Sequence, residues 1–304
     1  DTRSVLPNPP DRVRDRELPD GRWQDEWGVV RRLSPDGYYY DLDVCPMAGD
    51  PDLEVLERHP WPDPEDPGRY RGLKERVETL RKETDFAIVG HAPGGWVHTS
   101  QYLRGFEGWY ADLALRPDFA TALMEKIRDL VLKMAARFLE EVGPYLDVVA
   151  TGDDIGAQRG LMISPAMYRE LILPLQREQF RTIRAHTDAK IFYHTCGDIY
   201  PVLDDLVELG VEILNPVQVS AAEMGDTERL KREYGDRLSF WGGVDTFEVL
   251  PKGTPEDVRA EVDRRVEVLG RGGGYVLNAV HNLQPDVPVE NIIAMYEHGK
   301  TLRY

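Results

Sequence analysis

Short apolar runs alternate with amphipathic helical patterns along most of this chain, and this alternation limits its fold more than any other feature. Nearly continuous apolar strands separated by helices are typical of parallel strands that helices cover. The first run lacks the glycine-rich exit of a dinucleotide-binding sheet. The sequence therefore predicts an α/β protein, a (β/α)8 barrel, with one or two strands coming from the N-terminal part or absent from the sequence. The predicted strands are Phe86–Gly90, Leu146–Ala150, Lys190–Tyr193, Val211–Asn215, Leu238–Gly243 and Gly274–Asn278.

Helix-start signals between the runs support this pattern. Ser164 and Thr254 are each followed by a proline, so both are predicted N-caps with proline in the first turn. Asp257 is placed to complete a capping box with Thr254. Helices are predicted over residues 70–84, near 100–114, over 117–142, after Ser164, and over 201–209, 254–269 and 288–298.

The first seventy residues have a different pattern. Residues 1–22 are rich in Pro, Arg and Asp and are predicted to form a surface segment. Two β-prone runs flank the turn Ser34–Gly37 and predict a hairpin, and the proline-rich residues 50–70 predict an irregular connection. We therefore expect an N-terminal extension over 1–70 and a barrel domain over 71–304. The first residue is Asp1 and not Met, which leaves open whether the natural N-terminus is missing.

Charge and cysteine content exclude several classes of function. The net charge is −17 and no basic patch stands out, so a nucleic-acid partner is not expected. The two cysteines, Cys45 and Cys196, favour a reducing, cytoplasmic setting over a disulfide framework. No apolar run approaches the ~20 residues that span a bilayer, so no membrane partner is expected. The sequence leaves open whether the chain forms a homodimer.

Polar and aromatic loops follow each predicted strand. Loops at the carboxyl ends of the strands carry the chemistry in (β/α)8 barrels. We therefore expect these loops to meet at one mouth and to form a single enzyme site. They are His91–Trp96, Thr151–Gln158, His194–Asp198, Asn215–Gln218, Trp241–Asp245 and Asn278–Asn282.

His194 and Cys196 form the most informative pair at these strand ends. Residues two apart on an extended chain point to the same side, so the imidazole and the thiol share a face. These two groups make half of a zinc site, and His281 is the best third ligand. Three protein ligands would leave one position open for a substrate, which is the catalytic pattern. The alternative is that both are ordinary strand-end residues; Cys45 is a poor ligand candidate because it lies in the N-terminal region.

Further candidate site residues follow from their positions near the mouth. Asp153 or Asp154 is predicted to act as a catalytic acid or base, an outer metal ligand or a substrate-binding carboxylate, while the structural alternative is a loop cap. On an extended chain the two point opposite ways, so at most one faces the pocket. For Tyr168 the residues alone favour a core or surface role. The predicted substrate-binding set is His91, Trp96, Gln158, Tyr168, Trp241 and Asn278.

Several motifs taken together resemble one known superfamily. They span roughly residues 85–300 and comprise Tyr193–Gly197 (YHTCG), Trp241–Asp245 (WGGVD), Asn278–Asn291 (NAVHNLQPDVPVEN), and Gly152–Gly156 (GDDIG) with Ile163–Pro165 (ISP). The chain resembles the uroporphyrinogen decarboxylase-like superfamily, and within it the zinc-dependent corrinoid methyltransferases more than the decarboxylases. The resemblance implies a (β/α)8 barrel, in agreement with the strand pattern.

The same resemblance implies a metal and a partner. The methyltransferases bind Zn²⁺ through an H-x-C pair and a late ligand that is often Cys; the matching residues are His194, Cys196 and His281, a departure at the third position. True uroporphyrinogen decarboxylases work without a metal and bind substrate carboxylates through an N-terminal arginine-bearing segment, of which no counterpart is found.

The predicted function is therefore a zinc-dependent methyl transfer between a small methylated donor and the corrinoid (cobalamin) of a partner protein. The aromatic residues near the mouth favour an aromatic methyl ether, hence O-demethylation. Two alternatives stay open: a metal-free decarboxylase, in which Asp153 or Asp154 would orient pyrrole nitrogens, and a non-catalytic barrel subunit of a corrinoid complex.

Overall fold

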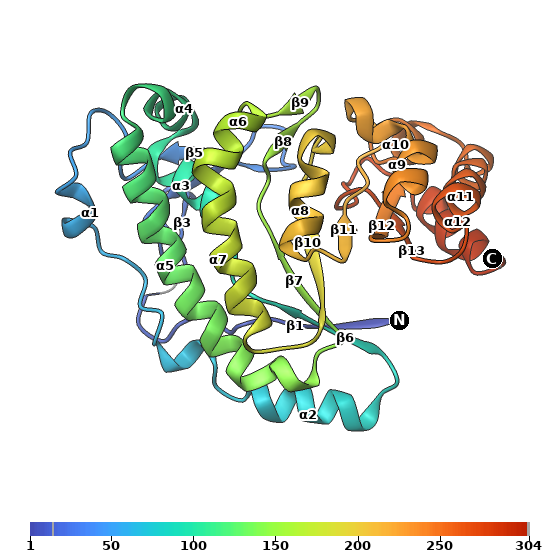
Figure 1. Ribbon diagram of the computed structural model, residues 1–304, viewed down its shortest axis with the longest axis horizontal. Helices are drawn as coiled ribbons and strands as arrows, with labels where there is room; N and C mark the ends of the chain where they lie inside the picture. Colours follow the sequence, from blue (N-terminus) through green and yellow to red (C-terminus); the bar gives the residue numbers. More distant parts are fainter. Residues whose placement is uncertain (14, 303–304) are drawn as a thin grey trace. The chain divides into compact units, whose positions relative to one another are not determined.

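The computed structural model describes residues 1–13 and 15–302. Contacts along the chain divide it into two compact units. The first unit comprises Asp1–Asp153 and Leu171–Ala189, and the second comprises Asp154–Glu170 and the chain from Lys190 onward. Each unit contains parallel strands alternating with helices, as the sequence predicts (Figure 1). The predicted division near residue 70 stays a prediction.

The first unit is built around three parallel strands. β6 (Ala87–His91) pairs with β1 (Thr2–Val5) on one side and with β7 (Val148–Gly152) on the other. Its helices are α1 (Val55–Arg58), α2 (Leu73–Glu83), α3 (Trp96–Arg104), α4 (Phe106–Leu115), α5 (Pro117–Val142) and α7 (Leu173–Arg184), with short 3-10 turns η1 (Pro67–Arg69) and η2 (Gly143–Tyr145). The long helices α5 and α7 pack along one another (Figure 1).

The first residues of the predicted surface segment 1–22 also supply a parallel strand, in agreement with the expectation that the N-terminal part contributes one or two strands. Thr2–Val5 form β1, in register with Ala87–Gly90 of β6. Only Val5 of this strand is buried, so its side chains carry no apolar run. Backbone pairing with β6, rather than a sequence pattern, makes these residues a strand.

A four-stranded antiparallel sheet follows β1. Its strands are β2 (Arg16–Glu17), β3 (Trp23–Gln24), β4 (Val30–Leu33) and β5 (Tyr40–Val44). β4 and β5 confirm the predicted hairpin, and the Ser34 hydroxyl donates to the Asp36 carboxylate in its turn. The predicted surface segment thus also contains β2.

The single helix predicted near residues 100–114 is two helices. α3 ends and α4 begins around Gly105, which has φ +79°. A side chain at that φ is strained, so glycine permits the break between the helices. In contrast, α5 covers the predicted range 117–142.

The second unit contains four parallel strands in the order β10 (Lys190–His194), β11 (Ile213–Asn215), β12 (Ser239–Val244) and β13 (Tyr275–Ala279). A small hairpin joins β8 (Gly156–Ala157) to β9 (Gly160–Leu161). The helices are α6 (Pro165–Met167), α8 (Leu203–Leu209), α9 (Thr227–Tyr234), α10 (Val249–Lys252), α11 (Pro255–Leu269) and α12 (Val289–Gly299), with 3-10 turns η4 (Tyr200–Val202) and η5 (Ala222–Gly225). A π-helical turn, η3 (Tyr168–Ile172), precedes α7 in the chain.

Both predicted caps are confirmed. The Ser164 hydroxyl accepts from the Met167 amide at the start of α6. Thr254 and Asp257 form the predicted capping box of α11. Within the described residues, no helix is both long and apolar enough to cross a membrane.

Candidate metal centre

The three predicted metal ligands come together in the second unit. His194 is the last residue of β10, Cys196 lies two residues later, and His281 follows β13. Their ligand atoms all lie within 4.8 Å of one another, and all three side chains are half-buried. Across residues 1–13 and 15–302, no other trio of His, Cys, Asp or Glu meets this criterion. Strand-end placement therefore brings residues 85 positions apart, Cys196 and His281, to one point.

The spacing and donor types fit zinc. The Cys196 Sγ lies 3.5 Å from the His194 Nε2. In a tetrahedral site with Zn–S of about 2.3 Å and Zn–N of about 2.0–2.1 Å, the sulfur and nitrogen would be roughly 3.6 Å apart. The His194 and His281 rings have centroids 6.2 Å apart. The thiol and the imidazole thus already have the separation that one shared zinc ion requires, with His281 as the third donor.

The His194 ring is held in one tautomer by its neighbours. Its Nδ1 lies 2.6 Å from the Asn215 Oδ1, and the Asn215 Nδ2 donates to the Trp241 carbonyl at 3.1 Å. Because the amide nitrogen only donates, the second bond directs the Asn215 oxygen toward His194. Nδ1 therefore carries the proton, and Nε2 presents its lone pair toward Cys196.

The register of the strands explains this chain of bonds. His194 and Asn215 are both terminal strand residues and are paired with each other between β10 and β11. Trp241 lies on β12, the next strand, and its ring packs edge-on against Phe192 of β10, with centroids 5.2 Å apart. Main-chain pairing therefore fixes the position of the metal-facing nitrogen.

Asp154 lies beside the cluster. Its Oδ1 accepts from the Cys196 amide at 2.7 Å and lies 3.8 Å from the His194 Nε2. Burial, reinforced by the Asp154 carboxylate, raises the pKa of the Cys196 thiol to about 12. Without a metal the thiol keeps its proton at neutral pH, so a metal must displace that proton to bind sulfur.

His281 is neutral at the same pH. Burial lowers the pKa of its imidazole, and the neighbouring His194 ring lowers it further. Neutral imidazole is the form that ligates metals. The cluster therefore combines one protonated thiol with two histidines suited to metal binding.

Asp153 makes contacts of another kind, within the first unit. Its carboxylate accepts from the Val97 amide at 2.6 Å and from the His98 amide at 2.9 Å, at the start of α3. Asp153 is buried, and burial raises its pKa. Through these contacts Asp153 caps the start of α3, which is a structural role. The catalytic role of Asp153 or Asp154 stays a prediction.

The predicted substrate-binding residues of the first unit differ in exposure. His91 is exposed at the end of β6, with its Nε2 3.1 Å from the Ser4 hydroxyl. Trp96 is fully buried and donates from its indole nitrogen to Gln179 at 3.0 Å. A packed indole of this kind contributes to the core of the unit; its role in binding a substrate stays a prediction.

The predicted substrate-binding residues of the second unit lie in separate surroundings. Tyr168 is fully buried, and burial raises the pKa of its phenol. The Gln158 side chain donates to the Ser220 carbonyl, and Asn278 accepts from the Tyr296 hydroxyl at 3.1 Å. Trp241 contributes the carbonyl that orients Asn215. The substrate-binding roles of these four residues stay predictions.

Two positioning residues were not predicted. Asn215 fixes the His194 tautomer, and the Gln218 Oε1 accepts from the Gly197 amide at 2.6 Å, next to Cys196. Gly197 has φ +88°, and a Cβ there would lie 2.4 Å from the Ala157 nitrogen, so only glycine fits. The sequence signal that could have identified Asn215 is its position at the end of a predicted strand, which is equivalent to the position of His194.

Comparison with known proteins identifies the family. The family model described as Uroporphyrinogen decarboxylase (URO-D) matches residues 39–302. The chain belongs to the uroporphyrinogen decarboxylase family. This confirms the resemblance seen in the sequence motifs and places the chain in a family of enzymes.

Curated relatives are identical to this chain at about a quarter of the aligned residues. The proteins named uroporphyrinogen decarboxylase from Pseudomonas entomophila and Methylococcus capsulatus are 26% identical over 245 residues and 24% identical over 258 residues. These alignments cover 79% and 83% of this chain and 66% and 69% of the respective relatives. The chain thus spans about two thirds of the length of these curated relatives.

A solved structure shares the fold. A methyltransferase from Methanosarcina mazei superimposes with a TM-score of 0.65 at 18% identity, covering 91% of this chain and 76% of that one. Identity at this level shows a common fold and no more. Together with the parallel strands and covering helices, it confirms the predicted (β/α) barrel class.

Proposed function

We propose that this protein is a zinc-dependent corrinoid methyltransferase, of the type that demethylates small methyl ethers. The observation that supports this most is the cluster of His194, Cys196 and His281, whose ligand atoms lie within 4.8 Å of one another. Three protein donors leave one coordination position for a reactant, as in catalytic zinc sites.

The roles of the chain's own residues follow from their contacts. Zn²⁺ held by the three donors would supply Lewis acidity to an ether oxygen or a thiol sulfur. Asn215 would keep the His194 Nε2 facing the metal, and Asp154 would hold the Cys196 main chain in place. The Cys196 thiol would release its proton on metal binding.

The substrate and partner belong to the same proposal. The donor would be a small methylated compound, with an aromatic methyl ether as the first candidate, and the methyl acceptor would be the Co(I) corrinoid of a cytoplasmic partner protein. The C–O bond would break, a Co–C bond would form, and the released alkoxide or phenolate would take up a proton. A thiol acceptor would reverse the direction, with the methyl group leaving the corrinoid.

The metal part is tested by elemental analysis of purified protein. We expect close to one zinc per chain and a large loss of zinc affinity in the His194→Ala/Cys196→Ser double variant. Absence of zinc from zinc-supplemented protein, or wild-type affinity in the double variant, would refute the metal site.

The transfer part is tested by methylcobalamin formation from Co(I)cobalamin with a panel of methoxylated aromatic compounds. We expect turnover that disappears in the double variant. A zinc-loaded protein that methylates neither cobalamin nor the corrinoid of a supplied partner protein would support a non-catalytic barrel subunit instead.

A second candidate is supported by the names of the curated relatives. A metal-free decarboxylase acting on a porphyrinogen would place Asp153 or Asp154 against the pyrrole nitrogens. It predicts release of CO2 from uroporphyrinogen by metal-free protein and unchanged activity in Cys196→Ser. Turnover of this kind, without methyl transfer, would replace the first proposal.

A further inference from the structure

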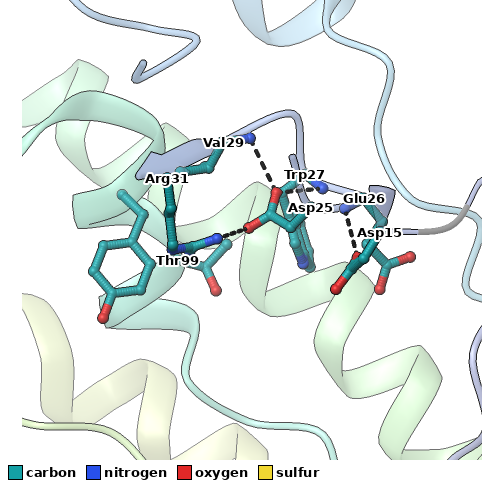
Figure 2. A pocket seen from close by; sticks show the side chains of 8 residues that line it. Asp15, Asp25, Glu26, Trp27, Val29, Arg31 and Thr99 are labelled. Atoms are coloured by element: carbon teal, nitrogen blue, oxygen red, sulfur yellow. Dashed lines mark hydrogen bonds and ion pairs between the residues drawn. The ribbon is translucent and has the colours of Figure 1, made fainter. Parts of the chain in front are cut away.

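Two cavities that share lining residues lie in the first unit. Their lining does not include His194, Cys196 or His281. Their volumes are about 310 Å³ and about 610 Å³. Both are lined by Asp15, Glu26, Trp27 and Thr99, and we call the two together the N-terminal cavity. Figure 2 shows the smaller part, with Asp15, Asp25 and Arg31 around it. The volume is that of a small-molecule site.

The N-terminal cavity lies where α/β proteins bind ligands. The larger part is lined by residues 7–10, directly after β1, and by Pro93 and Gly94, directly after β6. β1 and β6 are parallel, so both stretches follow carboxyl ends of strands. Ligands of open α/β sheets and barrels bind at this end.

The walls combine aromatic and aliphatic surface. Trp23 and Trp27 line the larger part together with Val131 and Met134 of α5. Trp23 is 38% exposed, so its ring is accessible. In the smaller part the Arg31 guanidinium lies 4.9 Å from the centre of the Tyr102 ring. Indole rings are the best partners for a cation placed over an aromatic face.

The charges of the lining favour a cationic ligand over a carboxylate-rich one. Arg31 is paired with Asp25 at 2.5 Å, and Arg69 is paired with Glu26 through a two-pronged contact. Both cationic side chains are therefore already neutralised. The remaining ionisable residue is Asp15, which accepts from the Glu26 amide at 3.1 Å and has no ion pair with any cation among the described residues. Among the described lining residues, three carboxylates against two guanidinium groups leave a net charge of −1.

We propose that the N-terminal cavity binds a small organic cation with a methylated ammonium group, recognised by the Trp23 and Trp27 indoles and the exposed Asp15 carboxylate that line it. The volume, the indole surface and the unbalanced negative charge all favour this class over an anion. The proposal concerns binding alone and does not depend on the metal site, so either can fail without the other.

The test compares choline with its neutral isostere, 3,3-dimethylbutan-1-ol, by titration calorimetry on the whole protein at low ionic strength. The two probes have the same shape and differ in charge. We expect choline to bind at least about fivefold more tightly, since cation–π and charge contacts at partly exposed sites contribute that order of affinity. The advantage should shrink as salt is added.

Two variants and a matched control assign the contacts. Asp15→Asn keeps an oxygen that can accept from the Glu26 amide but removes the charge, and it should abolish most of the preference for choline. Trp23→Leu should weaken choline binding about threefold or more. Glu17→Gln removes one charge from β2, whose residues line neither cavity, and should leave binding unchanged.

The outcomes separate the alternatives. Equal binding of choline and its isostere would show an apolar cavity without cation selectivity and overturn the proposal. Tighter binding of benzoate than of choline would overturn its charge argument, and no binding of choline would overturn it outright. Equal losses in Asp15→Asn and Glu17→Gln would show a general surface-charge effect in place of a site.

Discussion

At the scale of single residues, the orientation of the His194 imidazole decides whether its Nε2 can face the proposed metal ion. Asn215 is in contact with His194 and with the Trp241 carbonyl, so it ties the metal-facing nitrogen to the main chain of β12. Residues that orient a histidine ligand in this way contribute strongly to metal affinity although they do not touch the metal.

We therefore predict that Asn215→Leu weakens zinc binding by roughly 10–100-fold. Asn215→Asp, which keeps an acceptor for the His194 Nδ1 proton, should retain most of the affinity. Competition with a chromophoric chelator measures both. Equal affinity in Asn215→Leu and the wild type would show that the tautomer is set elsewhere, and thermal unfolding of the metal-free variants controls for loss of folding.

The third ligand position carries a second prediction, because the motif resemblance implies a late ligand that is often Cys at the position of His281. His281→Ala should release zinc, while His281→Cys should retain it with a second sulfur donor. Cobalt substitution reports this change as an added charge-transfer band from the new thiolate. Full zinc retention in His281→Ala would remove His281 from the ligand set.

The sequence predicts that these three side chains cluster better than it predicts the residues that hold them in place. His194, Cys196 and His281 are of types that bind metals, and the strand-end rule places them together. Asn215 was not found because an amide at a strand end has many structural uses. Only its pairing with His194 across β10 and β11 shows its function.

At the scale of elements, the sequence locates helix caps more precisely than it locates the short strand β1. The capping box predicted at Thr254 and Asp257 is present in α11. Thr2–Val5, in contrast, become a strand through pairing with β6, and only Val5 is buried. A cap depends on neighbours in the sequence, whereas a short parallel strand depends on a distant partner.

Removing the cap of α11 tests its contribution to stability. Thr254→Ala removes the hydroxyl that accepts from the Asp257 amide, and it should lower the free energy of unfolding by about 1 kcal/mol. Denaturant titration measures this loss. Thr79→Ala, in the interior of α2, is the matched control and should change stability by less than about 0.5 kcal/mol; equal losses would argue against a special role for the cap.

The junction of α3 and α4 carries a pH-dependent contribution. Burial opposes the charge of Asp112, but hydrogen bonds from Arg104 at 2.6 Å and Arg116 at 3.0 Å outweigh it and lower its pKa. A carboxyl whose pKa is lower in the folded state stabilises the fold above its unfolded pKa. That stabilisation is lost as the pH falls through the folded pKa.

Asp112→Asn should therefore cost roughly 2 kcal/mol at neutral pH. The difference from the wild type should shrink on acidification below about pH 4, where the unfolded carboxyl also takes up a proton. Unfolding titrations at several pH values measure it, with the exposed Asp85→Asn as control. A loss that does not change with pH would mean that Asp112 contributes through packing and not through charge.

At the scale of the whole molecule, the alternation of apolar runs and helices was sufficient to predict a (β/α) barrel class. Family membership and the shared fold agree with that prediction. The substrate could not be predicted in the same way, because the alternation of strands and helices does not show which side chains line a cavity. The lining of the N-terminal cavity becomes visible only in the structure, where it includes residues that follow β1 and β6.

His194, Cys196 and His281 are proposed to hold one zinc ion. The most direct measurement is an anomalous difference map from crystals of zinc-loaded protein, recorded on both sides of the zinc absorption edge. We predict one strong peak bonded to the Cys196 sulfur and to one nitrogen of each histidine. A map without a peak at this cluster, or with its only zinc peak elsewhere, would contradict the proposed metal site.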